Sequence, residues 1–464
     1  MPDFIPRWHL DHALRRLGRT SLRNRLHALR ALAEVRGVQY LDDAGRARTI
    51  ELALKPWVLT SAQLLFFHRV MQQLADALMR LPVLHARSQA VRQIVHFEPA
   101  RAAWLALARH PRSRPLAVMG RFDSTATYDH AGWRTDFCML EPNAVGVGGV
   151  HYAPAGCGIM LDVLGDVLAR ALPGRTISPT PDPRHLLTDE LAAVAKRLGR
   201  PLRAVALLEN TEFTTGTDEF GQLARSLRGQ GLWAAVVDPR QLRLRRGRVC
   251  VGKTAIDLLY RDCELQEFVD MEAGGRRLTA LRQAVREGRL ISGLHWEFDQ
   301  KSAWEIFTDP RYARAFTPAQ QRLFRKHLLW TRLVREARVS DPSGRLIDLP
   351  RYILRHQQRL VLKPNTLFGG EGVVLGKTVG RREWERELNR ALRGPRRYVV
   401  QALAAVARET FPMLVDGRVT TEDRSVVSGF FFNSTGVGLV GRFSAAPVVN
   451  VSQGGGLLSA LWAR

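Results

Sequence analysis

The sequence predicts an α+β protein of more than one domain, and three observations lead to this fold class. Its 464 residues are 45% hydrophobic and 24% charged, a composition that supports a sizeable core and excludes a disordered chain. Apolar residues recur at helical spacing over Leu22–Val35 and Ala62–Leu81. Short β-branched and aromatic runs separated by glycine dominate the C-terminal part, as expected for strands.

Residues 1–112 are expected to form a helical N-terminal region. Ile50–Val58 is expected to cross between its helices as a strand or a loop, and prolines at Pro111–Pro115 mark its end. The remainder is divided into residues 113–290, where short strands and helices alternate, and residues 291–464, which end in strands and glycine turns.

Residues 113–290 contain a strand–helix–strand unit, formed by Ala204–Leu208, a helix near Glu219–Gly229, and Leu232–Val237. A right-handed crossover would make its two strands parallel. The other expected elements are strands at Leu116–Gly120, Phe122, Trp133–Leu140 and Ile256–Tyr260, helices at Gly158–Ala171 and Leu187–Leu198, and a loop at Pro173–Pro183.

Residues 291–464 are expected to begin with a helical stretch from Ser302 to Val339. The strands expected after it are Leu360–Lys363, Val373–Gly376, Tyr398–Gln401, Phe411–Val415, Val426–Phe432 and Leu439–Phe443.

The segment Gly247–Thr254 matches the phosphate-loop pattern G-x-x-x-x-G-K-T letter for letter. That loop needs a buried strand before it and a helix after it. Here the preceding Leu242–Arg246 is strongly basic, and Val249–Val251 favours extended structure. The sequence therefore predicts a β-hairpin at this position rather than a nucleotide site.

The net charge of +25 suggests anionic ligands, but its distribution does not favour specific nucleic-acid binding. Sixty-two of the 69 basic residues are arginine, and they run through the whole chain. The four cysteines are scattered without C-x-x-C spacing, which argues against a disulfide framework or a zinc site. No apolar run long enough to span a bilayer and no secretory signal are visible, so a cytoplasmic protein without a membrane partner is expected.

Lys363 ends a predicted strand and is followed by the glycine-rich turn Gly369-Gly370-Glu371-Gly372. Glycines let backbone N–H groups approach an anion closely, and a lysine ammonium can neutralise phosphate charge. An ordinary glycine-rich hairpin with a surface lysine is the alternative interpretation.

Two further segments are compatible with a nucleotide site. Tyr398–Leu403 is a strand passing into a loop, which could offer backbone groups to an adenine edge or simply belong to the core. Lys301 lies at the start of a predicted helix and could contact phosphates or belong to a solvated helix end.

Polar residues at alternate positions mark two strands in residues 113–290. Arg121 and Asp123 share one face of a strand, and so do Glu141 and Asn143. If the two strands pair, these four side chains meet and offer the hard oxygen ligands that Mg²⁺ takes alongside nucleotide phosphates. A structural salt-bridge network is the other interpretation.

The order of these motifs, with V-x-K-P at Val361–Pro364 and G-R-F at Gly441–Phe443, resembles a circularly permuted, type 2 ATP-grasp ligase. The sequence is similar to the glutathionylspermidine synthetase-like group over Leu116–Arg464. The resemblance implies an ATP-grasp fold with a preATP-grasp-like α/β substrate region in residues 113–290 and a nucleotide-binding region in residues 291–464.

The resemblance also implies roles for individual residues. Asp123, Glu141 and Asn143 would hold Mg²⁺, and Arg121 and Arg442 would steady the transferred phosphoryl group and act in catalysis. The ATP contacts would come from Lys301, Lys363, Gly369, Gly370, Glu371, Gly372, Gln401 and Leu403, the last two at the adenine.

The implied activity is an ATP- and Mg²⁺-dependent carboxylate–amine ligase that works through an acyl phosphate and releases ADP and phosphate. Its substrates would be a small-molecule or peptide carboxylate and an amine. Glu209, at the end of the Ala204–Leu208 strand, is a candidate substrate contact because open α/β sheets bind ligands at such ends. Asn450 and Ser452 are further candidates, in a segment that could line the acceptor pocket or form a flexible tail. Because the protein is strongly basic, a polycationic amine is not favoured. Two other functions stay open: an ATP-binding protein that acts by partner binding without catalysis, and a basic nucleic-acid-binding protein.

Overall fold

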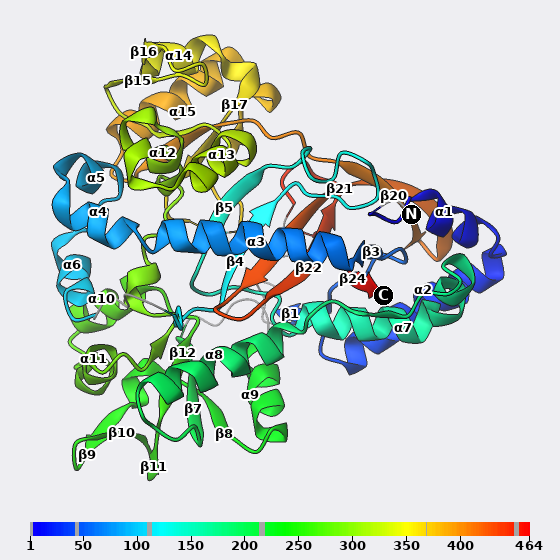
Figure 1. Cartoon of the computed structure of the whole chain (residues 1–464), viewed down its shortest axis with the longest axis horizontal. Helices are drawn as coiled ribbons and strands as arrows, with labels where there is room; N and C mark the ends of the chain where they lie inside the picture. Colours follow the sequence, from blue (N-terminus) through cyan, green and yellow to red (C-terminus); the bar gives the residue numbers. More distant parts are fainter. Residues whose placement is uncertain (1–2, 42–45, 109–113, 213–218, 368, 450–453) are drawn as a thin grey trace.

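The computed structural model describes residues 3–41, 46–108, 114–212, 219–367, 369–449 and 454–464. A central antiparallel sheet lies between an antiparallel lobe, drawn in yellow and orange, and a parallel lobe, drawn in green (Figure 1). Helices of the N-terminal region pack around this arrangement. The protein is therefore a mixed α/β structure, as the sequence predicted.

The central sheet joins segments that are far apart in the chain. Its strand order is β23-β22-β21-β4-β5, and β20 also pairs with β21. The strands are β4 (Gly120–Ser124), β5 (Met139–Asn143), β20 (Arg408–Val415), β21 (Arg418–Phe432), β22 (Val437–Ser444) and β23 (Gly456–Leu458).

One face of the central sheet is apolar because its strands alternate in side-chain polarity. Phe122 and Phe430 pack beneath the long helix α3 (Ser61–Leu78), where Phe67 stacks on Phe430 with ring centroids 4.5 Å apart. Arg121 and Asp123 alternate with Phe122 and so lie on the opposite face. The helix thus fixes the sheet while leaving the polar face for the site.

The antiparallel lobe has the strand order β14-β19-β17-β18. Its core packs Trp384, Leu388 and Ala391 of one helix against Leu360, Leu362 and Val400 of the sheet. The elements are β14 (Thr331–Leu333), β15 (Arg338–Ser340), β16 (Leu346–Asp348), β17 (Leu360–Pro364), β18 (Val374–Leu375), β19 (Tyr398–Ala402), α12 (Ala303–Thr308), α13 (Pro318–His327), α14 (Leu349–Arg355) and α15 (Arg381–Arg393).

The parallel lobe confirms the expected strand–helix–strand unit. Its sheet has the order β13-β12-β7-β8, and every adjacent pair is parallel. The elements are β7 (Ala204–Leu208), β8 (Trp233–Val237), β12 (Leu258–Arg261), β13 (Leu290–Ile291), α8 (Pro183–Arg197), α9 (Glu219–Gly229), α10 (Leu265–Ala273) and α11 (Thr279–Arg286).

The segment that matches the phosphate-loop pattern is a hairpin, as predicted. β9 (Arg243–Arg245) pairs antiparallel with β10 (Arg248–Val251), and β11 (Thr254–Ala255) follows where a phosphate loop would lead into a helix. Gly247 and Gly252 take the positive φ angles of tight turns.

The N-terminal region contributes helices and also strands of two small sheets. In one of them β24 lies between β3, to which it is parallel, and β6. Besides α3, the elements of this region are α1 (Trp8–Arg15), α2 (Arg19–Val35), α4 (Leu81–Arg87), α5 (Gln89–Ile94), α6 (Pro99–Leu105), β1 (Gln39–Leu41), β2 (Ala47–Thr49) and β3 (Trp57–Thr60). The other two strands of the sheet that contains β3 come from later in the chain: β6 (Ile177–Pro179) and β24 (Ala460–Ala463).

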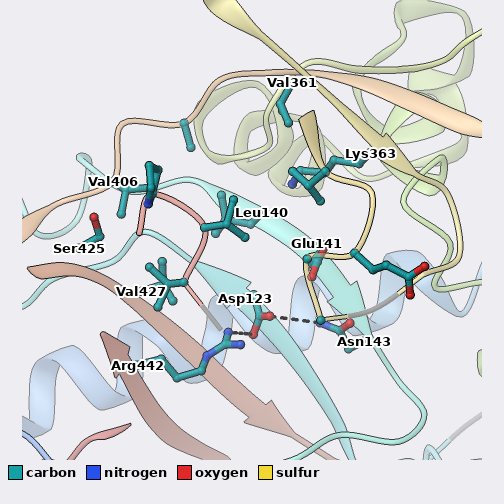
Figure 2. A pocket seen from close by; sticks show the side chains of 18 of the residues that line it. Asp123, Leu140, Glu141, Asn143, Val361, Lys363, Val406, Ser425, Val427 and Arg442 are labelled. Carbon is teal, nitrogen blue, oxygen red and sulfur yellow. Dashed lines mark hydrogen bonds and ion pairs between the residues drawn. The ribbon is translucent and has the colours of Figure 1, made fainter. Parts of the chain in front are cut away.

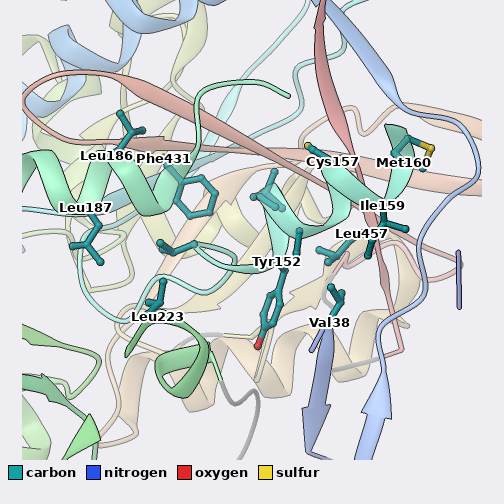
Figure 3. Packing of buried hydrophobic residues seen from close by; sticks show 14 of the residues in the cluster. Val38, Tyr152, Cys157, Ile159, Met160, Leu186, Leu187, Leu223, Phe431 and Leu457 are labelled. Atoms are coloured by element: carbon teal, nitrogen blue, oxygen red, sulfur yellow. The ribbon is translucent and has the colours of Figure 1, made fainter. Parts of the chain in front are cut away.

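Helix α7 (Tyr152–Ala171) is, among the described helices, long and apolar enough to cross a membrane by length and composition alone. Over an 18-residue window of its 20 residues the mean hydropathy is 1.3, and 67% of that window is buried inside the protein. Tyr152, Ile159 and Met160 belong to a cluster that also contains Val38 and Leu457 (Figure 3). The helix therefore packs as a core helix.

Several expected boundaries were wrong. The strands expected at Leu116–Gly120 and Trp133–Leu140 lie a few residues later, as β4 and β5, and the helical stretch expected up to Val339 ends at His327. Leu116 and Met119 are buried without belonging to a strand, because burial depends on packing and not on ladder hydrogen bonds.

One buried ion-pair network connects the three expected regions. Glu297 accepts from Arg261 Nη1 at 2.6 Å and from Arg101 Nη2 at 3.1 Å, and Arg261 is fully buried. Arg101, Arg261 and Glu297 come from residues 1–112, 113–290 and 291–464 respectively. The regions are thus held together by charge as well as by apolar contact.

Candidate functional site

A cavity of about 1050 Å³ lies between the polar face of the central sheet and the antiparallel lobe. Figure 2 shows Asp123, Glu141 and Asn143 on one side of it and Lys363 on the other. Most of the residues singled out in the sequence line this cavity: Arg121, Asp123, Glu141, Asn143, Lys301, Lys363, Gly369, Gly370, Glu371, Gln401, Leu403 and Arg442.

The pairing of β4 with β5 brings four of these residues onto one face, as the sequence predicted. Asp123 lies opposite Glu141, and Arg121 lies opposite Asn143. Directly opposite residues of an antiparallel pair point to the same side, so both carboxylates and the amide face the cavity. The Asn143 amide lies 3.5 Å from Asp123 Oδ2.

Asp123 is held by two arginines. Arg121 Nε and Arg442 Nη2 each lie 2.8 Å from its Oδ1 atom. Burial alone would raise the pKa of Asp123, but the two guanidinium groups outweigh it and lower that pKa to about 2. The carboxylate is therefore ionised and available as a hard oxygen ligand at neutral pH.

Gly429 makes the arginine arrangement possible. It lies between Asp123 on β4 and Val440 on β22 in the sheet register. A Cβ atom at this position would come within 2.7 Å of Arg121 Cδ and 2.9 Å of Val440 Cγ1. The missing side chain leaves the space through which Arg121 approaches Asp123.

The two lysines approach the acidic pair from the antiparallel lobe. Lys301 Nζ donates to the Leu367 carbonyl at 2.7 Å and lies 3.4 Å from Glu141 Oε2. Lys363 Nζ donates to Gln401 Oε1 at 2.8 Å, and burial lowers the pKa of this ammonium group. The amide partner of Lys363 is neutral, so a bound anion would give its ammonium group a negatively charged partner.

Asn365 connects the two lysine-bearing segments. Its side-chain oxygen accepts from the Ser302 N–H at 2.8 Å, its amide donates to Gln300 Oε1 at 2.9 Å, and its carbonyl accepts from the Lys301 N–H at 3.2 Å. Asn365 is 2% exposed. The V-x-K-P strand thereby fixes the backbone at Lys301.

The glycine-rich turn after Lys363 has the backbone that its sequence requires. Gly369, Gly370 and Gly372 have φ angles of 67°, 76° and 67°, a region that side-chain-bearing residues rarely adopt. Glu371 is exposed and lies 3.8 Å from Arg396. This turn borders the cavity beside both lysines.

The segment expected at an adenine already forms hydrogen bonds within the protein, which the sequence did not indicate. Gln401 uses its side chain internally, donating to the Leu140 carbonyl at 3.1 Å and to Thr331 Oγ1 at 3.0 Å. The N–H groups of Ala402 and Leu403 donate at 2.8 Å to the carbonyls of Trp330 and Arg359. The role of Gln401 and Leu403 at an adenine stays a prediction.

The donor set suits Mg²⁺ better than a metal that needs a complete protein cage. Among the described residues, no three His, Cys, Asp or Glu side chains gather as a metal-binding group. Asp123, Glu141 and Asn143 supply two carboxylates and one amide oxygen on neighbouring strands. Mg²⁺ is commonly held by one or two carboxylates, with waters and phosphates completing its shell.

Sequence reasoning missed the loop that closes the cavity beside Arg121. Arg121 Nη1 donates to the Gly148 carbonyl at 2.6 Å, and Gly149 and His151 donate their N–H groups to Glu219 at 2.8 and 2.6 Å. Burial raises the pKa of Glu219 to about 7. The glycine-rich run Gly146–Gly149 could have indicated this loop. No pattern in the sequence around Glu219 indicates that its carboxylate binds the loop.

Of the three candidate substrate contacts, only Glu209 belongs to the described residues. Glu209 follows β7, and its N–H donates to the Val237 carbonyl at 3.2 Å, so it lies in the parallel lobe outside the cavity lining. Asn450 and Ser452 lie outside the described residues.

The fold of this chain is similar to that of solved structures, although no family model and no curated protein sequence matches the chain. A glutathione synthetase-like effector from Globodera pallida, in its apo form, superposes with a TM-score of 0.60 over 96% of this chain and 97% of its own, at 11% identity. The chain has a glutathione synthetase-like fold.

Two other solved structures are similar over smaller shares. A γ-glutamylcysteine synthetase homologue from Methylobacillus flagellatus has 13% identity and a TM-score of 0.35, over 81% of this chain and 83% of its own. The ATP-grasp ligase PsnB, complexed with a minimal precursor, has 14% identity and a TM-score of 0.22, over 54% and 90%. The assignment of the glutathione synthetase-like fold rests on the first similarity, and the circular permutation stays a prediction.

Proposed function

We propose that this protein is an ATP- and Mg²⁺-dependent ligase that joins a carboxylate to an amine. The observation that carries the proposal is the cavity itself, where two lysines, an acidic pair and two arginines converge from the antiparallel lobe and the central sheet of a glutathione synthetase-like fold. Phosphoryl transfer to a carboxylate requires this kind of positioning and charge neutralisation.

The nucleotide would lie between the two sheets, with its phosphates at Lys301 and Lys363. The Lys301 side chain is buried and that of Lys363 is partly buried, so a phosphate there would interact with limited screening by solvent. Gly369–Gly372 would close over the phosphates with backbone N–H groups. The adenine would lie towards Leu140, Val361 and Leu403.

Asp123, Glu141 and Asn143 would hold Mg²⁺. When bound, the ion would neutralise charge on the phosphate oxygens. The present partners of these side chains would have to yield some of their contacts, since Asp123 faces both arginines and Glu141 faces Lys301.

Arg121 and Arg442 would act on the reacting groups. A carboxylate oxygen of the substrate attacks the γ-phosphorus, the bond to the β-phosphate oxygen breaks, and ADP leaves. An amine then attacks the acyl carbon, phosphate departs with the bonding pair, and the amine loses a proton. The two guanidinium groups would orient the carboxylate and stabilise the phosphate charge throughout.

The proposed organisation follows the chain. Residues 1–112 form a mainly helical region, residues 113–290 carry the acidic strands and the parallel lobe, and residues 291–464 carry the nucleotide lobe. The acidic strands β4 and β5 precede the lysine-bearing segments in sequence, which is the order proposed for the permuted fold. A cytoplasmic location remains part of this proposal.

The first test measures thermal unfolding with a non-hydrolysable ATP analogue, with and without Mg²⁺. At a hundred times its dissociation constant the ligand should add about 2.7 kcal/mol of stability. Lys363→Ala should abolish the Mg²⁺-dependent shift, whereas Lys326→Ala, at an exposed position on α13, should retain it.

The second test measures ADP release with pools of acids and amines. Release that requires both an acid and an amine, and that falls strongly in Lys363→Ala, supports the ligase. Tight Mg²⁺-nucleotide binding without release would favour the partner-binding alternative. Salt-sensitive affinity for nucleic acid, with no nucleotide shift, would favour the third function.

A further inference from the structure

The cavity extends beyond the groups proposed to bind phosphate and metal, and the part of its floor beside Arg442 is aliphatic. Further along β20 and β21 the lining is polar, with Ser425 and with Arg408, which is paired with Asp423.

The aliphatic part, or apolar end, is defined by the central-sheet register. Val440 lies opposite Gly429, which lies opposite Asp123, and Asp123 lies opposite Glu141. Along this row the cavity floor changes from carboxylate at β4 and β5 to aliphatic at β22.

The neighbouring row repeats the change. Val427 on β21 lies opposite Arg442 on β22, which lies opposite Leu457 on β23. Val427, Val440 and Leu457 all line the cavity and are 3–4% exposed. Arg442 therefore stands at a boundary, with Asp123 on one side and aliphatic side chains on the other.

The N-terminal region and the start of α7 enclose the apolar end. Tyr40 and Leu41 of β1 line it together with Tyr152, and Tyr152 packs in the cluster that contains Val38 and Leu457 (Figure 3). Gly149 helps to keep it open. A Cβ at Gly149 would come within 3.0 Å of the Phe431 ring and 3.8 Å of Val440.

The carboxylates of the described cavity lining are also confined to its polar side. The carboxylates among the described cavity-lining residues are Asp123, Glu141 and Glu371, and each faces an arginine or a lysine on the polar side. The described residues at the apolar end therefore offer no carboxylate to an ammonium group. Arg442 Nε, in contrast, is buried and has no hydrogen-bond partner within the described part of the chain.

We propose that the carboxylate substrate is a monoacid with an uncharged, apolar body, aliphatic or aromatic. Its carboxylate lies at Arg121 and Arg442, and its body packs against Val427, Val440 and Leu457. A zwitterionic substrate would place its ammonium group among the aliphatic side chains of Val427, Val440 and Leu457, where desolvation is costly and no cavity-lining carboxylate of the described residues lies beside it. This inference rests on the proposed ligase function and names the substrate class of the same site.

The test compares acids of matched length on the protein saturated with Mg²⁺ and the non-hydrolysable ATP analogue. Heptanoate and 6-aminohexanoate differ only in whether the chain ends in a methyl or an ammonium group, and 4-phenylbutyrate probes an aromatic body. Heptanoate or 4-phenylbutyrate should raise the unfolding temperature of the complex further, and 6-aminohexanoate at the same concentration should not.

The contrary results separate the two proposals. If the nucleotide analogue itself gives no Mg²⁺-dependent shift, the ligase proposal fails. If the nucleotide binds but 6-aminohexanoate stabilises the complex as well as heptanoate does, or none of the three acids adds stability, the apolar substrate class is overturned while the nucleotide site stands.

Two adjacent valines provide a matched pair of variants. Val427 lines the cavity, whereas Val426 is buried on the opposite face of β21 in the cluster under α3. Val427→Thr keeps the side-chain shape but introduces a hydroxyl, and it should weaken heptanoate binding roughly tenfold without weakening the nucleotide. Val426→Thr should lower stability while leaving heptanoate affinity unchanged; equal effects of the two variants on affinity would contradict the proposal.

Discussion

Arg442 and Asp123 form a 2.8 Å ion pair although a whole strand, β21, separates the strands that carry them. The contact is possible because the face of β21 between them carries small or short side chains. Arg121 shares the same carboxylate, so the position of both arginines depends on the residues of β21 beneath them.

Gly429→Ala should displace Arg121. The new Cβ would lie 2.7 Å from Arg121 Cδ, so the guanidinium must move from Asp123. We expect kcat/KM for ADP release to fall on the order of a hundredfold, because small misplacements of an orienting group are costly. Overpacking should also cost about 1–3 kcal/mol of stability.

Steady-state kinetics and urea unfolding measure both effects. Gly165→Ala in α7 is the control, because a Cβ there meets open space and a helical alanine should raise stability by up to about 1 kcal/mol. Full activity in Gly429→Ala would show that activity does not depend on the position of the Arg121 guanidinium beside Asp123.

Asn365→Ala should loosen the backbone that carries Lys301. Three hydrogen bonds between Asn365 and residues 300–302 would be reduced to the backbone one. We expect the dissociation constant of the Mg²⁺–ATP analogue to rise roughly tenfold, in line with the loss of about 1.4 kcal/mol from imperfect positioning. Calorimetric titration measures the constant, and Asn389→Ala, at an exposed site on α15, should leave it unchanged.

Glu219 should make stability depend on pH near neutrality. Burial raises its folded-state pKa from 4.5 to about 7, so the unfolded chain releases this proton more readily than the folded one. Its contribution is greatest below pH 4.5 and is lost as the pH rises through about 7, at up to about 1.4 kcal/mol per pH unit.

Urea unfolding of wild type and Glu219→Gln at pH 5.5 and 7.5 tests this relation. The wild type should lose more stability than the variant between the two values, because glutamine does not titrate. The exposed Glu385→Gln should behave as wild type does. Identical pH dependence in wild type and Glu219→Gln would refute a raised pKa at Glu219.

Glu297→Ala should destabilise the whole protein, since it leaves the buried Arg261 guanidinium without its carboxylate. Removing one partner of a buried ion pair costs about 3–5 kcal/mol. Calorimetry should show a lower unfolding temperature, whereas Glu385→Ala, which breaks an exposed helix pair with Arg381, should change stability by less than about 0.5 kcal/mol. Comparable losses in the two variants would argue against a linking role for Glu297.

Much of the site could be predicted because its spacing is local. Arg121 and Asp123 are two residues apart, and so are Glu141 and Asn143, so strand geometry alone places each pair on one face. Helix α15 also had a signal, since Trp384, Leu388 and Ala391 follow helical spacing within a highly charged segment, but this signal was missed.

Other parts could not be predicted because they depend on tertiary contacts. Tyr40 and Tyr152 reach the cavity from the N-terminal region and α7, and no pattern around either residue indicates it. Gln401 was expected at an adenine edge, but its amide is engaged by Lys363, Leu140 and Thr331, three positions from separate segments. Secondary-structure propensity and residue spacing carry no information about contacts between segments that are distant in sequence.

The placement of β24 between β3 and β6 has a consequence for how the protein acquires its structure. Ala460 pairs with Trp57, and Asp123 lies beside Gly429, so strands that must join are separated by most of the chain. Such non-local pairing slows folding and leaves apolar faces uncovered in the meantime. During synthesis the acidic strands emerge long before their partners, so the nascent chain should depend on chaperones until the later strands arrive.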